Sequence, residues 1–247
     1  MYLKLQSLLT NRNKVILFRL SILVFVFLEG IIVPLIVDKT YYSEIEYLKN
    51  IAWSCLIGTV GFTGGTQYLF FTKKNSKIFT HISGPYIITV IIISVLFMFY
   101  YKNLWILFIC LAIMGCQFNE QILKVNEKFF LSFLVKPIIS VSILFLVFFL
   151  NMSANLMITL SFIFTFIIMY YLRNNLYPFS ISWNWIKWKE TIKSGLLLSL
   201  GTGIYGLMIL SERTYGMEHF FDNMGAYSLF VSFTNISVVL QLFLKNG

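Results

Sequence analysis

The sequence predicts an all-α fold, a polytopic membrane bundle of about eight transmembrane helices. The 247 residues are 58% hydrophobic and only 12% charged, which departs strongly from the composition of soluble domains. Apolar runs recur at close to the roughly 20 residues that a membrane-spanning helix needs. Lysines and arginines gather in alternate connections between these runs, as the positive-inside rule requires of a multi-pass protein.

The spans can be taken in order. The first follows the polar segment MYLKLQSLLTNRNK and has no small-residue cleavage site, so we expect it to stay in the mature protein. The second contains four glycines in GTVGFTGGTQ, which indicate close helix packing or a bend. Short polar connections separate the next four, and a longer one runs from Arg173 to Lys193 before the last two. The predicted spans are 15–37, 50–71, 80–100, 104–123, 130–150, 154–172, 194–213 and 223–244.

The charges orient these spans. With the N-terminus in the cytoplasm, most of the 19 lysines and arginines fall in cytoplasmic connections, and only Lys39, Lys49, Lys102 and Arg213 fall outside. This asymmetry supports both the eight-span count and a cytoplasmic N-terminus. The net charge of +9 is then explained by topology, so nucleic acid is not an expected partner.

The connection before the seventh span, SISWNWIKWKETIKSG, alternates tryptophan with lysine. Tryptophan favours the headgroup region and lysine favours anionic inner-leaflet lipid. We expect a helix on the cytoplasmic membrane surface; a plain basic loop is the alternative. The same connection divides the chain into a six-helix bundle, 1–180, and an interfacial helix with two further spans, 181–247. The predicted membrane-interface residues are Trp183, Trp185, Trp188, Lys187 and Lys189.

Few residues in the chain suggest enzymatic or cofactor chemistry. Cys55, Cys110 and Cys116 all lie in apolar runs and are expected to pack as small hydrophobic residues. The two histidines, His81 and His219, are far apart, and no metal-binding spacing, nucleotide loop or catalytic triad is legible. We therefore expect no metal, no cofactor and no enzymatic activity.

Charges inside apolar runs are the candidate functional residues, because a charge at mid-bilayer costs about 2.5–3.5 kcal/mol on insertion scales. Glu29 lies near the middle of the first span. It is expected to be a protonated packing residue, a proton or cation site, or the partner of a buried arginine. Arg19, one turn inside the same span, either snorkels to the inner headgroups or faces a cavity. Glu212 and Arg213 end the seventh span, as a solvated pair or inside the bundle, where the guanidinium suits phosphate.

The order of these features resembles the Wzx-type flippases, the polysaccharide-transport branch of the MOP (multidrug/oligosaccharidyl-lipid/polysaccharide) exporter superfamily. The resemblance rests on the outside Tyr/Glu segment YYSEIEYL, the glycine-rich second span, the basic segment after six spans, and SGLLLSLGTGIYGLMILSERTYG followed by MGAYSLFVSF. It covers nearly the whole chain. Glu212 replaces the acidic residue that is more often aspartate, and the family carries about twelve to fourteen spans, so this chain is expected to be C-terminally truncated.

The resemblance implies a MOP/MATE-like bundle in the bacterial cytoplasmic (inner) membrane. It implies flipping of undecaprenyl-pyrophosphate-linked oligosaccharide repeat units for O-antigen, lipopolysaccharide or capsule biosynthesis, with other surface-polysaccharide assembly proteins as possible partners. Cations would hold the pyrophosphate and aromatic residues would contact sugars. The implied substrate-binding residues are Arg19, Glu29, Tyr205, Glu212, Arg213 and Tyr227.

Three alternatives stay open from the sequence. A drug/cation antiporter of the same superfamily would use an acidic cavity residue such as Glu29. A membrane-bound polysaccharide polymerase or acyltransferase would need a large outside loop, whereas the longest outside connection has about a dozen residues. An inactive truncated membrane fragment is the third.

Overall fold

The computed structural model describes residues 11–59, 61–73, 78–149, 152–175 and 180–220. Within these ranges all regular structure is helical, which confirms the predicted all-α class. The predicted eighth span, 223–244, lies outside the described residues. The elements are α2 (Asn11–Ile36), α3 (Lys39–Cys55), the 3₁₀ helix η1 (Leu56–Thr59), α4 (Phe62–Lys73), α5 (Ile78–Tyr101), α6 (Leu104–Val125), α7 (Phe129–Ser132), α8 (Val135–Phe149), α9 (Ala154–Asn174) and α10 (Trp185–Phe220).

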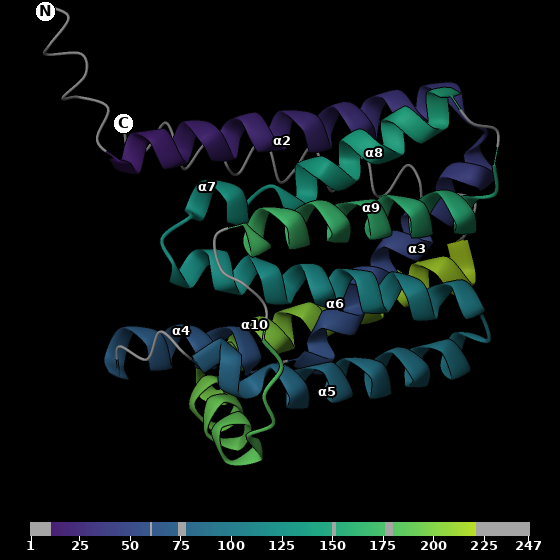
Figure 1. Cartoon of the computed structure of the whole chain (residues 1–247). Coiled ribbons are helices and arrows are strands. Elements are labelled where there is room, and N and C mark those ends of the chain that lie inside the picture. Colours follow the sequence, from purple (N-terminus) through teal and green to yellow (C-terminus); the bar gives the residue numbers. More distant parts are fainter. Residues whose placement is uncertain (1–10, 60, 74–77, 150–151, 176–179, 221–247) are drawn as a thin grey trace, which may run out of the picture.

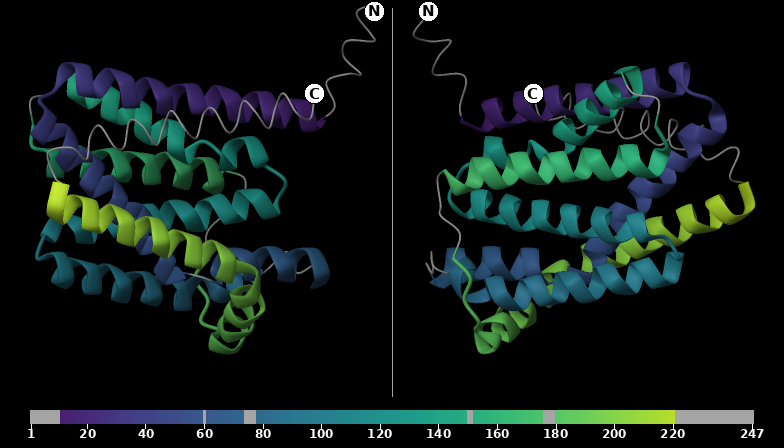
Figure 2. Two further views of the ribbon diagram at one scale, coloured as in Figure 1. Left: turned by 180° about the vertical axis from the view of Figure 1, so that it is seen from behind. Right: turned by 45° about the vertical axis from the view of Figure 1, so that its right-hand side comes forward.

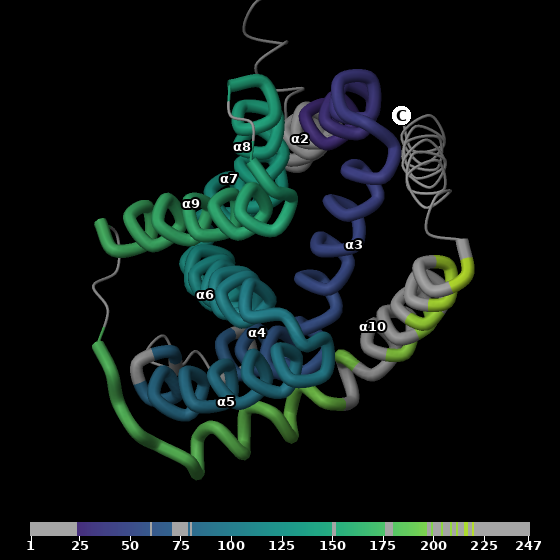
Figure 3. The backbone as a smooth tube through the Cα atoms, turned by 90° about the vertical axis from the view of Figure 1, so that its right-hand side faces the viewer, coloured from purple at the N-terminus to yellow at the C-terminus, as the bar shows by residue number. Residues whose placement is uncertain are grey.

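The long helices run side by side as a bundle with α6 at its centre (Figure 1). Helix α6 packs between α5 and α9, α8 lies beside α9, and α2 lies beside α8. Helix α3 crosses the bundle obliquely and contacts both α6 and α9 (Figure 3). Helix α10 packs on α4 and α5.

Three described helical stretches are long and apolar enough to cross a membrane, namely His81–Tyr101, Leu104–Val125 and Ala154–Asn174. Two shorter stretches, Val24–Ile36 and Val135–Phe149, are also apolar. Large apolar side chains on these helices are exposed, including Leu96, Phe99, Phe149 and Phe164. Such helices need an apolar surrounding, so the chain associates with a membrane.

Polar residues fix the helix starts. Asp38 caps α3, and its carboxylate accepts a hydrogen bond of 2.8 Å from the Tyr41 amide. Asn103 caps α6 in the same way through the Trp105 amide, at 2.9 Å. Lys102, between α5 and α6, has a φ of 52°, which lets the chain reverse within a short turn.

The segment predicted as one span at 50–71 is not one continuous helix. Helix α3 ends at Cys55, η1 follows, and α4 begins only at Phe62. Gly61, at the junction, has a φ of 92°, a conformation open to glycine but strained for other residues. The YYSEIEYL segment, expected as an outside loop, belongs to α3.

Two further predicted boundaries differ in the structure. The span predicted at 130–150 is divided into α7 and α8 by Phe133 and Leu134. The predicted surface helix and seventh span form one helix, α10, instead of two. The green start of α10 lies across the bundle axis and the yellow-green remainder takes a different direction (Figure 2). The division of the chain at residue 180 stays a prediction.

Candidate functional site

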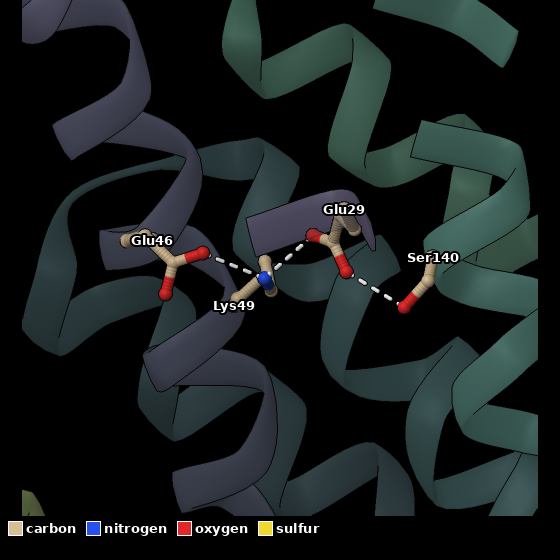
Figure 4. Close-up of polar contacts among 4 residues, drawn as sticks. All are labelled: Glu29, Glu46, Lys49 and Ser140. Carbon is tan, nitrogen blue, oxygen red and sulfur yellow. Dashed lines mark hydrogen bonds and ion pairs between the residues drawn. The ribbon is translucent and has the colours of Figure 1, made fainter. Parts of the chain in front are cut away.

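The candidate site is a charged cluster in the interior of the bundle, built on Glu29 of α2 (Figure 4). The Glu29 side chain is only 3% exposed. Its Oε1 lies 2.7 Å from Nζ of Lys49 on α3. Its Oε2 accepts a hydrogen bond of 2.6 Å from Oγ of Ser140 on α8. One carboxylate thus joins α2 and α3, which are neighbours in the sequence, to α8, which is more than a hundred residues away.

Lys49 holds a second carboxylate. Its Nζ lies 2.6 Å from Oε1 of Glu46, one turn earlier in α3. Tyr42, Glu46 and Lys49 lie at helical spacing on one face of α3. That face points inward, since Tyr42 is 4% and Glu46 is 7% exposed. Helix α3 therefore turns a polar face toward the bundle interior.

The cluster carries one more negative than positive charge when Glu29, Glu46 and Lys49 are all ionised. A buried ion pair pays a large desolvation penalty, and an uncompensated buried charge is more unfavourable still. The excess negative charge therefore favours a positively charged group at this place. The Lys49 side chain is 17% exposed, which makes it the most accessible of the three charged side chains.

The sequence identified one of the three charged residues. Glu29 was expected from its place in an apolar run, with a buried arginine among its candidate partners; the structure gives it a lysine. Lys49 was assigned to an outside connection, and Glu46 and Ser140 were not singled out. The signal for α3 was present in the Asp38 cap and in the spacing of Tyr42, Glu46 and Lys49.

The other predicted substrate-binding residues are placed only in part. Arg19 lies in α2, and Tyr205, Glu212 and Arg213 lie in α10. The structure does not describe the side chains of these four residues. Tyr227 lies outside the described residues.

The predicted membrane-interface residues lie at the start of α10. Trp183 and Trp185 are exposed, at 58% and 52%, and Lys189 is exposed as well. Lys187 pairs with Glu190 at 3.0 Å. Trp188 turns inward instead, with its ring centre 6.1 Å from those of Phe62 and Tyr86.

A second polar row follows the helix break. Gln117 of α6 accepts a hydrogen bond of 2.8 Å from Thr59 and donates one of 3.2 Å to Thr63. One turn further on, Gln67 of α4 donates to Gln121 of α6 at 3.1 Å. These uncharged bonds hold η1 and α4 against α6, as polar side chains do between membrane helices.

Comparisons of the chain with protein-family models, curated proteins and solved structures found no match. The fold and the cluster define a class: a membrane-associated helical bundle with a charged site in its interior.

Proposed function

We propose that this chain belongs to a transporter that flips undecaprenyl-pyrophosphate-linked oligosaccharide repeat units across the bacterial cytoplasmic membrane. The observation that carries the proposal is the Glu29–Lys49–Glu46 cluster, which lies inside a bundle of apolar helices. Ionisable residues within membrane bundles mark ion and substrate pathways more often than structural sites. The sequence resemblance to Wzx-type flippases supplies the substrate class.

A purely structural role would explain the cluster poorly. Apolar residues of similar volume often stabilise a protein as well as a buried ion pair does. Here the pair is also unbalanced, because one ammonium faces two carboxylates. A proton or cation that binds here neutralises the excess negative charge. Its binding and release can therefore change the relative stability of two conformations.

In the proposed mechanism the polar head of the substrate crosses in a wet cavity between two helical bundles, while the lipid tail stays in the bilayer. This avoids the several kcal/mol that each unsatisfied polar group costs in hydrocarbon. Binding and release of a positive charge at Glu29 and Glu46 drive the change between inward-open and outward-open states. Arg19 and Arg213 hold the pyrophosphate, and Tyr205 and Tyr227 contact sugars. Glu212, the neighbour of Arg213 in the sequence, contributes to the same substrate site. The multi-pass topology has its N-terminus in the cytoplasm and about eight spans.

Complementation tests this proposal. The chain is expressed in a context that supplies both helical bundles, in a strain that lacks its own repeat-unit flippase, and surface polysaccharide is measured. Restored polysaccharide is expected, with loss in Glu29→Gln and Arg213→Ala and no loss in Lys102→Gln, which alters an exposed turn. Absence of polysaccharide with a well-expressed, membrane-inserted chain would contradict the proposal.

A drug/cation antiporter is the second candidate, and the acidic excess of the cluster favours it. Cationic substrates would compete for the carboxylates of Glu29 and Glu46. Efflux of a cationic dye from a drug-sensitive host distinguishes the two functions. Efflux that requires Glu29, without complementation of the flippase-null strain, would select the antiporter.

A further inference from the structure

The start of α10 has two chemically different faces. Trp188, Thr191 and Gly195 form the inner face, which packs on α4 and α5. Thr191 is fully buried, and the Trp188 ring lies against Phe62 and Tyr86. At 3.6 residues per turn, these inner residues fall on one side of the helix.

The opposite face is exposed and combines apolar and cationic side chains. Ile186 is 83% exposed, and Trp185 and Leu196 are exposed as well. Lys189 and Lys193 lie between them on the same face and are also exposed. Among the described side chains neither lysine has a carboxylate partner, and the nearby Glu190 bonds Lys187 at the edge of this face.

Hydrogen bonds to α5 anchor the segment just before this helix. Just before α10, the Ser182 amide donates to Oγ of Ser83 at 3.0 Å, and the Gly84 amide donates to the Ser182 carbonyl at 3.0 Å. Oγ of Ser83 in turn lies 3.1 Å from the Ser180 carbonyl oxygen. The exposed face is therefore held outward.

The orientation of the segment matches a membrane surface. The green start of α10 lies across the axis of the bundle (Figures 1 and 3). It does so toward the end of the bundle where α6 ends and α7 begins. An amphipathic helix in the membrane plane buries its apolar side chains at the acyl boundary and directs its lysines to the headgroups.

We propose that the exposed face formed by Trp185, Ile186, Lys189, Lys193 and Leu196 binds the anionic lipid surface of the membrane. The two lysines supply charge complementarity, because the acidic residue nearest this face, Glu190, is paired with Lys187. The three apolar side chains add a hydrophobic contribution, because their surface leaves water when the helix enters the acyl boundary. This inference does not depend on the transported substrate.

Lipid binding by the purified full chain tests the contribution of the two lysines. Native mass spectrometry measures its affinity for phosphatidylglycerol and for phosphatidylcholine. Lys189→Gln and Lys193→Gln are each expected to weaken phosphatidylglycerol binding about fivefold, with no effect on phosphatidylcholine. Lys102→Gln, at the opposite end of the bundle, is the control and is expected to behave as wild type. Equal phosphatidylglycerol affinity in all variants would overturn the proposal.

The depth of the helix in the membrane tests the contribution of the apolar side chains. An environment-sensitive fluorophore on Ile186→Cys, in vesicles of the full chain, is expected to be quenched by lipids brominated near the glycerol. The same label on Lys128→Cys, in the turn between α6 and α7, is expected to report water. Water-like emission at position 186 would overturn the proposal. Burial without lipid quenching would also overturn it, because another protein surface would then cover this face.

Discussion

Gly65 and Gly195 lie backbone against backbone, where α4 meets α10. A Cβ built on Gly195 would lie 2.2 Å from the Gly65 amide nitrogen and 1.9 Å from the Gly61 carbonyl oxygen. A Cβ on Gly65 would lie 1.9 Å from the Thr191 carbonyl oxygen. Neither backbone can yield as a side chain can, so this contact admits only glycine.

Substitution at this contact should destabilise the protein. Gly195→Ala is expected to cost about 3 kcal/mol, at the upper end for overpacking, because two backbones must separate. Gly58→Ala is the matched control. Its Cβ would meet only side-chain atoms of Ile93, with the terminal Cδ1 nearest at 2.7 Å, so a loss below about 1 kcal/mol is expected. Thermal unfolding in detergent compares the two, and an equal loss would contradict the backbone contact.

The charge balance of the cluster predicts an order of stability. Lys49→Met leaves two buried carboxylates without a cation and should cost about 3–5 kcal/mol. Glu46→Gln leaves a balanced pair of Glu29 and Lys49, so it should cost far less. The triple change Glu29→Gln, Glu46→Gln and Lys49→Met should recover most of the loss. Thermal unfolding of the variants gives the order, and a Glu46→Gln variant as unstable as Lys49→Met would refute it.

The hydrogen bond from Ser140 of α8 to Glu29 of α2 predicts a smaller loss of stability than that in Lys49→Met. Ser140→Ala removes a hydrogen bond to a buried carboxylate, which contributes about 1.5–3 kcal/mol. Ser161→Ala is the control, because Ser161 is equally buried but bonds only the Met157 carbonyl of its own helix, at 2.9 Å. The control should lose less than half as much stability. Similar losses in both variants would show that Ser140 does not support Glu29.

The Asp38 cap predicts a loss of stability that is confined to the first turn of α3. Asp38→Ala removes the acceptor for the Tyr41 amide and should cost about 1 kcal/mol, while Asp38→Asn should retain most of the stability. Hydrogen exchange of the first turn of α3 is the direct measurement. Unchanged exchange at Tyr41 and Tyr42 in Asp38→Ala would exclude the cap.

Strong local signals made part of this fold predictable. The runs at 80–100, 104–123 and 154–172 became α5, α6 and α9 with small shifts at their ends, because continuous apolar runs of that length have few alternatives. Helix α3 was missed because its charges lower its hydropathy. Its burial depends on Glu29, twenty residues away in sequence, and no local pattern reveals that pairing.

The candidate site shows the same limit. Glu29 stood out because a carboxylate in an apolar run requires an explanation. Ser140, in contrast, is one of several serines in apolar runs, and its role appears only when α8 packs beside α2. The glycines of the second run indicated packing or a bend, and the structure contains both. The partner in that packing, Gly195, lies far along the chain.

The helix break at Gly61 separates two packing surfaces. Lys49 and Glu46 sit on α3, before the turn, whereas Gly65 and its contact with α10 lie after it. A helix continuous through this position would continue along the axis of α3. Because the helix is broken at Gly61, α3 can keep its charged face beside α2 while α4 takes the different course that lays it against α10.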